Sequence, residues 1–199
     1  MTIAYHVGKN LYLNITNRCT ARCDFCLRGR VSGVGDAEDL WLEYEPDIEE
    51  ILKSAAQVDW RNAPEIVFCG FGEPTMRLDV MLEAAREFKK QKPAIKLRLN
   101  TNGHGSMIEG RDITPELSVF DVVSVSLNYP DSESYNKHCP TIFGDKAYDS
   151  VLEFIRSAVK YVPNVTASVL SFLSDDDIER ARKIAENLGA DFRVREESR

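Results

Sequence analysis

Three cysteines lie within eight residues near the N-terminus, in the stretch "NRCTARCDFCLRGR": Cys19, Cys23 and Cys26. Thiolates are soft ligands that bind zinc ions and iron–sulfur clusters. Three thiolates are one ligand short of a tetrahedral zinc site. The two other cysteines, Cys69 and Cys139, form no second pair of ligands such as CxxC. A zinc site with a distant fourth ligand and an iron–sulfur cluster with one open position both remain as interpretations.

The length, composition and net charge of the chain exclude several classes of function. The chain has 199 residues, of which 43% are hydrophobic and 29% charged, and this predicts one globular domain over 1–199. The net charge of -7 gives no attraction to nucleic acid or to an anionic membrane. No apolar run approaches the roughly 20 residues of a membrane span, and "MTIAYHVGKN" has no signal-peptide core. We therefore expect a cytoplasmic protein with reduced thiols and a small-molecule or protein partner.

Short β-rich runs alternate with helical segments along the chain, and this alternation predicts a parallel α/β fold. The six expected strands cover 10–16, 65–69, 94–100, 121–128, 164–172 and 191–195. The expected helices cover 45–58, 77–91, 146–162 and 174–190, with a short one within 113–120.

Apolar and polar residues alternate within these strands. Leu97 and Leu99 alternate with Arg98 and Asn100, for example, and a similar alternation runs through 121–128. If helices cover the apolar face, the polar face must line a wet interior. This predicts an open, partial (β/α)6 barrel of six parallel strands with helices outside and a polar ligand inside. An open sheet with one solvated face is the alternative.

The spacing CxxxCxxC, with Phe25 before the last cysteine, resembles the signature of the radical S-adenosylmethionine (SAM) superfamily. The segments "FCGFGEP" (68–74), "NTNG" (100–103) and "SVSLN" (124–128) follow in the order that this family shows. The resemblance implies that the three cysteines hold a [4Fe-4S] cluster whose fourth position belongs to SAM. It also implies that an electron donor such as flavodoxin or ferredoxin reduces the cluster, which cleaves SAM to a 5′-deoxyadenosyl radical. That radical takes a hydrogen atom from a small substrate.

The same resemblance implies a set of SAM contacts. The glycine-rich segment would meet the amino group of SAM, and polar residues at later strand ends would meet its ribose and carboxylate. An aromatic residue and the fifth strand would lie beside the adenine. The residues carried over are Phe25, Gly70, Gly72, Glu73, Asn100, Ser126, Asn128, Val169 and Leu170.

Four further segments, "NLYLNITNRC", "GVGDAEDLWLEYEP", "GRDITPEL" and "FRVR", resemble a small radical SAM family associated with TatD-type nucleases. This likeness implies a queuine lyase, which splits queuine and releases a 7-aminomethyl-7-deazaguanine-type base. An enzyme like 7-carboxy-7-deazaguanine synthase and a glycyl-radical activase are the alternatives within the superfamily. A non-catalytic zinc-binding protein is the alternative outside it.

Substrate contacts are expected from the polar strand faces and from the long first loop, in which Gly33 and Gly35 are expected to give mobility. The candidates are Asn14, Asp36, Trp41, Glu43, Arg98, Arg193 and Arg195. The arginines could instead pair with carboxylates, and the loop could be a surface cover anchored by Trp41. Cys139 and Tyr129 could donate a hydrogen atom or serve only in packing, and Cys69 is expected to be a buried packing residue.

Overall fold

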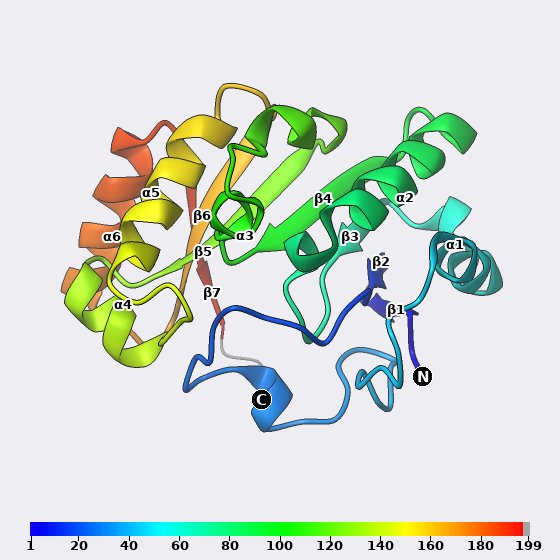
Figure 1. Ribbon diagram of the computed structural model, residues 1–199, viewed down its shortest axis with the longest axis horizontal. Helices are drawn as coiled ribbons and strands as arrows, with labels where there is room; N and C mark the ends of the chain where they lie inside the picture. Colours follow the sequence, from blue (N-terminus) through cyan, green and yellow to red (C-terminus); the bar gives the residue numbers. More distant parts are fainter. Residues whose placement is uncertain (197–199) are drawn as a thin grey trace.

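The computed structural model describes residues 1–196 as a seven-stranded sheet flanked by helices (Figure 1). The strands follow one another in chain order; β1 pairs antiparallel with β2, and every later pair is parallel. The strands are β1 (Ala4–Val7), β2 (Asn10–Leu13), β3 (Glu65–Phe68), β4 (Lys96–Thr101), β5 (Val122–Asn128), β6 (Asn164–Leu170) and β7 (Asp191–Arg195). The predicted partial barrel with six parallel strands and helices outside is confirmed.

Helices occupy the connections between the parallel strands, and α2, α5 and α6 form a layer over the sheet in Figure 1. The α-helices are α1 (Ile48–Gln57), α2 (Leu78–Gln91), α3 (Gly105–Glu109), α4 (Ser132–His138), α5 (Lys146–Ala158) and α6 (Asp175–Asn187). The short 3-10 helices are η1 (Leu27–Gly29), η2 (Trp60–Asn62), η3 (Pro74–Arg77) and η4 (Thr114–Val119). Within residues 1–196, no helix combines the length and the apolar composition needed to cross a membrane.

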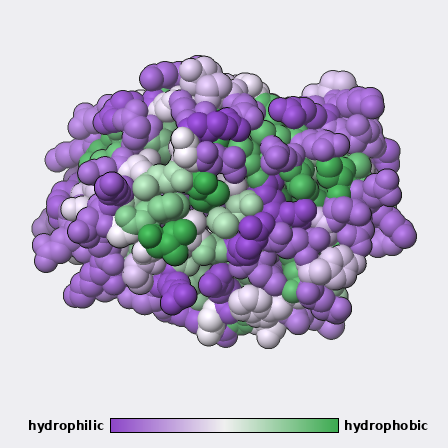
Figure 2. Space-filling model, in the orientation of Figure 1, coloured by the Kyte–Doolittle hydropathy of each residue, from purple (hydrophilic) through white to green (hydrophobic). Residues whose placement is uncertain are grey.

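The core lies between the helices and the apolar face of the sheet. Leu97, Leu99, Val123 and Val125 are fully buried in it, as expected from the alternation along β4 and β5. On the helix side, Figure 2 shows polar residues over most of the molecular surface, with apolar residues gathered in a few patches. The opposite, polar face of the strands lines a cavity rather than open solvent, so the interior predicted for the barrel is present.

The sequence analysis missed β1, α3 and α4. The strand β1 has only four residues and turns into β2 through Gly8 and Lys9, with Gly8 at φ 62°. A strand this short carries too little alternation to stand out, and an antiparallel hairpin needs no helical crossover. The helix α4 is also short; its first turn is fixed by Asp131, whose carboxylate accepts a hydrogen bond from the backbone N–H of Ser134 at 2.8 Å.

The long loop between β2 and α1, residues 14–47, passes beneath the sheet in Figure 1 and packs against β1. Leu40 of this loop forms a small apolar cluster with Tyr5 and Phe71. Gly35 has φ +67°, and a Cβ added there would lie 2.0 Å from the carbonyl oxygen of His6. The glycine therefore allows a tight backbone contact. The mobility expected from Gly33 and Gly35 stays a prediction.

Helix α1 begins with a reciprocal cap. The Asp47 carboxylate accepts a hydrogen bond from the Glu50 N–H at 2.9 Å, and the Glu50 carboxylate accepts one from the Asp47 N–H at 3.0 Å. We predict that Asp47→Ala lowers the free energy of unfolding by about 1 kcal/mol, because the backbone N–H of Glu50 loses its partner. Urea titration of the cluster-free protein measures the change. Glu49→Ala, in the same turn, is the control, and equal losses in the two variants would contradict the assignment.

Candidate cofactor and substrate site

A cavity of about 610 Å³ lies between the polar face of the sheet and the loop that carries the three cysteines. Such a volume is typical of a small-ligand site. Its wall combines the cysteine-bearing segment, the carboxyl ends of the parallel strands and the N-terminal hairpin. The residues with functional groups in the lining are Tyr5, Tyr12, Cys19, Cys23, Cys26, Arg28, Cys69, Arg98, Asn100, Asn102, Ser124, Ser126, Asn128, Arg193, Arg195 and Glu196.

All three clustered cysteines line this cavity with partly exposed side chains. Among residues 1–196, no three Cys, His, Asp or Glu side chains converge on a point that could hold a single metal ion. The three thiols reach the cavity from one short loop, and thiolates are the ligands of a [4Fe-4S] cluster, in which each binds a different iron. The donor set therefore fits a cluster. Burial raises the pKa of Cys19 to about 11, so the loss of its proton is coupled to metal binding.

Residues 19–26, which we call the cysteine loop, are held from one side by the segment after α4. The cysteine loop runs antiparallel to residues 138–142, and three backbone hydrogen bonds of 2.9 to 3.1 Å join them. Arg22 and Asp24 donate two of these bonds, and Thr20 accepts the third. The Asp24 carboxylate also lies 2.7 Å from the ring of His138. This ladder fixes a loop that contains no helix or strand of its own.

A buried polar network holds the other side of the cysteine loop. The Asn102 amide donates to the Thr20 hydroxyl at 3.1 Å and lies 3.7 Å from the Cys19 sulfur. The same hydroxyl lies 2.8 Å from Nδ1 of His104, whose Nε2 lies 3.0 Å from the Tyr135 hydroxyl. Burial lowers the pKa of His104 to about 4, so the ring is neutral near pH 7. A neutral imidazole can donate at one nitrogen and accept at the other, as this chain of contacts requires.

Glu73 stabilises the same region instead of facing the cavity. Its carboxylate accepts hydrogen bonds from the Thr101 hydroxyl at 2.7 Å, the Asn102 N–H at 2.7 Å and the Thr75 hydroxyl at 2.8 Å. The side chain is 4% exposed, and burial raises the pKa of Glu73 while these donors oppose the rise. The carboxylate is thus held by donors of the protein and is not part of the cavity lining. Its expected contact with the ammonium group of SAM stays a prediction.

Most of the other residues expected to contact SAM do line the cavity, namely Phe25, Gly70, Asn100, Ser126, Asn128 and Leu170. Val169 does not, because its side chain lies in the core on the helix side. Gly72 does not either: a Cβ there would lie 2.3 Å from the Thr16 carbonyl oxygen, so this glycine lets the loop after β3 pack against the chain before the cysteines. The alternating strand pattern places Val169 and Leu170 on opposite faces.

Two buried acceptors in the cavity wall have no partner within the described residues: Oδ1 of Asn100 and Oδ1 of Asn128. A buried acceptor without a partner is costly, so a ligand with hydrogen-bond donors is expected to satisfy these atoms. SAM carries an ammonium group and two ribose hydroxyls. The chemistry of the wall therefore fits SAM beside the cysteine loop.

Of the residues expected to bind substrate, Arg98, Arg193 and Arg195 line the cavity. Arg98 forms an ion pair with Glu65 at 2.9 Å, so the alternative of charge pairing is confirmed for this arginine. Nε of Arg98 and Nε of Arg195 are nevertheless buried without a partner in residues 1–196. Burial also lowers the pKa of Arg195, whose Nη2 lies 3.5 Å from the Ser126 hydroxyl. We therefore expect the two unpartnered Nε–H groups to donate hydrogen bonds to acceptors of a bound ligand.

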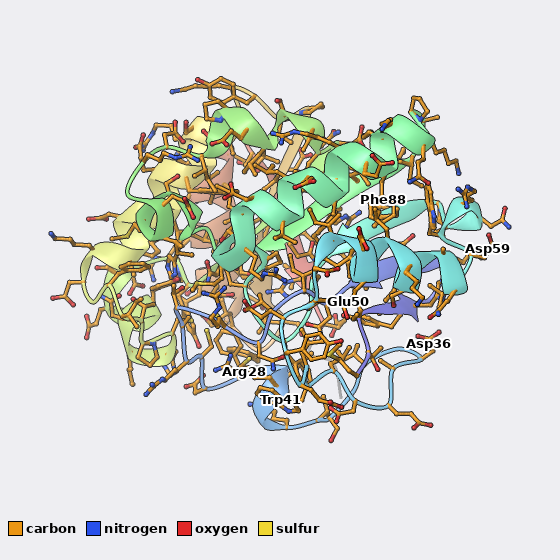
Figure 3. All side chains as sticks on the ribbon, turned by 45° about the vertical axis from the view of Figure 1, so that its right-hand side comes forward. Arg28, Asp36, Trp41, Glu50, Asp59 and Phe88 are labelled. Atoms are coloured by element: carbon orange, nitrogen blue, oxygen red, sulfur yellow. The ribbon has the colours of Figure 1, made fainter. Side chains whose placement is uncertain are left out.

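The remaining substrate candidates do not line the cavity. The Asn14 amide is buried and donates to the Leu40 carbonyl at 2.6 Å. Asp36 accepts a hydrogen bond from the His6 N–H at 2.6 Å, and Glu43 is exposed. Trp41 is 43% exposed and packs edge-on against Phe71. Figure 3 shows Trp41 and Arg28 on the loop beneath the sheet, with Asp36 apart from them. The loop walls the cavity through Arg28, Val34 and Leu40.

Several functional residues escaped the sequence analysis. Tyr5 lies on the missed strand β1, so nothing pointed to it. Cys69 lines the cavity with a partly exposed side chain, which corrects its expected role as a buried packing residue. The sequence pattern could have predicted this position of Cys69. Along β3, Ile66 and Phe68 face the core, so Glu65, Val67 and Cys69 lie on the opposite face. Tyr12 alternates with Leu11 and Leu13 along β2, so the same alternation places it on the cavity side.

The comparisons with known proteins identify the class. Residues 13–185 match the model of the radical SAM superfamily, and the chain belongs to that family. A probable GTP 3′,8-cyclase from Thermococcus kodakarensis is 31% identical over 171 residues, which are 85% of this chain and 50% of that protein. Aminodeoxyfutalosine synthase from Streptomyces coelicolor is 31% identical over 96 residues, 48% of this chain and 22% of that one. The chain thus spans half or less of these relatives.

Solved structures agree on the fold. HydG, a maturase of the [FeFe]-hydrogenase, superposes with a TM-score of 0.67 at 15% identity, covering 96% of this chain and 42% of that one. SuiB of Streptococcus suis bound to SAM superposes with a TM-score of 0.64 at 16% identity, covering 94% and 38%. The protein is therefore a radical SAM enzyme, with a [4Fe-4S] cluster and SAM as its cofactors.

The buried His104 predicts a pH dependence of stability. Between pH of about 6.5 and 4, an unfolded histidine binds a proton that the folded one excludes, so acidification through this range lowers the free energy of unfolding. We predict that His104→Gln is less stable than wild type at pH 7 but loses less stability on acidification. Urea titrations of cluster-free protein at several pH values measure this. Half-exposed His6→Gln is the control; parallel curves for wild type and His104→Gln would contradict the prediction.

Proposed function

We propose that this radical SAM enzyme is a lyase that acts on a small 7-deazaguanine base, with queuine as its substrate, and releases a 7-aminomethyl-7-deazaguanine-type product. The proposal includes a flavodoxin- or ferredoxin-type electron donor and a reducing, cytoplasmic setting. The proposal is supported by the cavity residues that are not assigned to the cluster or to SAM, namely Tyr5, Tyr12, Phe71 and Arg98. The resemblance of four sequence segments to the family that includes a queuine lyase adds to that support.

The observation that carries the proposal is a set of flat apolar groups beside one buried donor. The rings of Tyr5 and Tyr12 lie 5.5 Å apart, and Phe71 lines the same cavity. Arg98 lies on β4 in this wall, held by Glu65, with Nε unpartnered. Aromatic side chains pack well against a planar ring system, and a guanidinium donor suits a ring carbonyl. A deazaguanine offers both features.

The name of one relative also supports a guanine-like ring as the substrate. The similar protein from Thermococcus kodakarensis is named as a probable GTP 3′,8-cyclase, and GTP contains guanine. A 7-deazaguanine presents the same carbonyl and amine edge as guanine. The recognition of that edge is therefore the feature that we expect to be shared, while the group attached to the ring differs.

When bound, the cluster and SAM supply the one-electron cleavage of SAM and the abstraction of a hydrogen atom. The protein's own residues have simpler tasks. Cys19, Cys23 and Cys26 hold the cluster, and the acceptors of Asn100 and Asn128 orient SAM. Arg98 orients the substrate ring. The apolar side chains of the long loop, which line the cavity, exclude water that would react with a radical.

The experiment is release of 5′-deoxyadenosine by anaerobically reconstituted protein with an added reductant, across queuine, other 7-deazaguanines, GTP and peptides. We predict that queuine stimulates the release and yields 7-aminomethyl-7-deazaguanine. Arg98→Met should lower kcat/KM for queuine by on the order of tenfold, because a hydrogen bond to a charged group is lost. Exposed Lys96→Met, two residues earlier on β4, is the matched control.

The other outcomes are informative. Stimulation by GTP alone would replace queuine with a nucleotide substrate, and stimulation only by a glycyl-radical protein would indicate an activase. If no 7-deazaguanine stimulates the release above the substrate-free rate, the queuine proposal is wrong, while membership of the superfamily is unaffected.

A further inference from the structure

Positive charge is concentrated in the cavity wall of a protein whose net charge is -7. Among the described residues, the lining has one carboxylate, that of Glu196, and four arginines: Arg28, Arg98, Arg193 and Arg195. Arg98 is paired with a carboxylate, and Arg28 follows the cysteine loop in η1. The two arginines of β7 form no ion pair with a carboxylate within residues 1–196. A wall of this kind attracts an anion.

The side chain of Arg195 extends across the inner face of the sheet. β7 is the last strand of the sheet, and β6 lies between β7 and β5. Arg195 pairs in register with Leu170 of β6, and its Nη2 lies 3.5 Å from the hydroxyl of Ser126 on β5. The guanidinium therefore lies over β6, inside the cavity, next to a residue of the wall that we assign to SAM.

This position of Arg195 is costly unless a ligand compensates the charge. Nε is buried and has no hydrogen-bond partner in the part of the chain that the structure describes. A charged group shielded from water lowers stability unless an opposite charge or hydrogen bonds compensate it. Burial lowers the pKa of Arg195 for the same reason, but a guanidinium stays charged in proteins. We therefore expect the compensating charge to come from an anion that enters the cavity.

The other unpartnered groups assigned to SAM cannot bind an anion. Oδ1 of Asn100 and Oδ1 of Asn128 are acceptors, which suit ammonium and hydroxyl donors. A carboxylate or a phosphate instead requires donors, and a guanidinium presents several N–H groups in a planar fork. Arg195 is such a donor on the same wall. Arg193, two residues earlier and on the same face of β7, lines the same cavity and is more exposed.

We propose that Arg195, with Arg193 beside it on β7, forms a subsite for an anionic group, a carboxylate or a phosphate. The buried Nε of Arg195 donates to the anion, and Arg193 adds charge from the exposed part of the wall. Two ligands can supply the anion: SAM, through its carboxylate, or a substrate with an anionic group. Queuine has no anionic group, so with queuine as the substrate the anion is the carboxylate of SAM. The subsite itself is independent of the queuine assignment.

The test measures Kd values by calorimetry for the reconstituted full chain and for Arg195→Met and Arg193→Met. The probes are SAM, decarboxylated SAM, and inorganic phosphate added to the SAM-loaded protein. We expect Arg195→Met to weaken the binding of SAM or of phosphate by on the order of tenfold and to leave decarboxylated SAM unchanged. Arg193→Met should have a smaller effect in the same direction. A loss with SAM identifies its carboxylate as the anion, and a loss with phosphate identifies a group of the substrate.

Arg182→Met is the matched control. The Arg182 guanidinium lies 4.7 Å from the ring centroid of Phe192, which faces the helices from the other side of β7, so this variant loses an equal charge outside the cavity. Its Kd values should match those of wild type. Unchanged binding of both SAM and phosphate in Arg195→Met would overturn the proposal, and so would an equal loss in Arg182→Met.

A stability measurement separates an anion subsite from a role in the fold. In urea titrations of cluster-free protein, Arg195→Met should shift the midpoint to higher urea, because the variant removes a buried charge that has no partner. Arg182→Met should show no such rise. A lower midpoint for Arg195→Met would overturn the proposal, because the protein itself would then stabilise the guanidinium. No queuine is added in either experiment, so failure here is distinct from failure of the queuine assignment.

Discussion

The structure depends on fixing a short polar loop across the carboxyl ends of parallel strands. The cysteine loop has no helix or strand of its own, yet three thiols must be held far enough apart to bind three different irons. Two sets of contacts meet this constraint. The backbone ladder to residues 138–142 holds one side, and the network of Asn102, His104 and Glu73 holds the other. The glycine-rich turn after β3 adds backbone hydrogen bonds from Gly72 and Glu73 to the chain just before the cysteines.

The polar interior of the sheet follows from the same arrangement. Helices cover only the outer face of the sheet, so the inner face needs no apolar partner and can carry Arg, Asn and Ser. Buried polar atoms without protein partners then mark where ligands belong. We infer that the unpartnered Oδ1 atoms of Asn100 and Asn128 accept hydrogen bonds from SAM, and that Nε of Arg98 and Nε of Arg195 donate to ligand acceptors. The polar face of the sheet forms one wall of the cavity, and the cysteine loop forms another.

The features that the sequence predicted correctly depend on the pattern of neighbouring residues within one strand. The alternation of Leu97 and Leu99 with Arg98 and Asn100 fixes which side chains enter the cavity, because side chains alternate along any strand. The roles of Glu73 and Asn14 were harder to predict from sequence, because both residues are polar and close to the site. Only tertiary contacts determine that their side chains hydrogen bond to the protein itself. The same holds for the path of the long loop, which turns Asp36 and Trp41 away from the cavity.

We infer that Cys19, Cys23 and Cys26 hold a [4Fe-4S] cluster with one position left for SAM. Anaerobic reconstitution followed by metal and sulfide analysis, with electron paramagnetic resonance of the reduced protein before and after addition of SAM, tests it most directly. We predict about four iron and four sulfide per chain. We also predict a spectrum that changes on addition of SAM, and loss of the cluster in Cys19→Ala, Cys23→Ala and Cys26→Ala. Colourless protein that binds zinc and takes up no iron under these conditions would contradict the account.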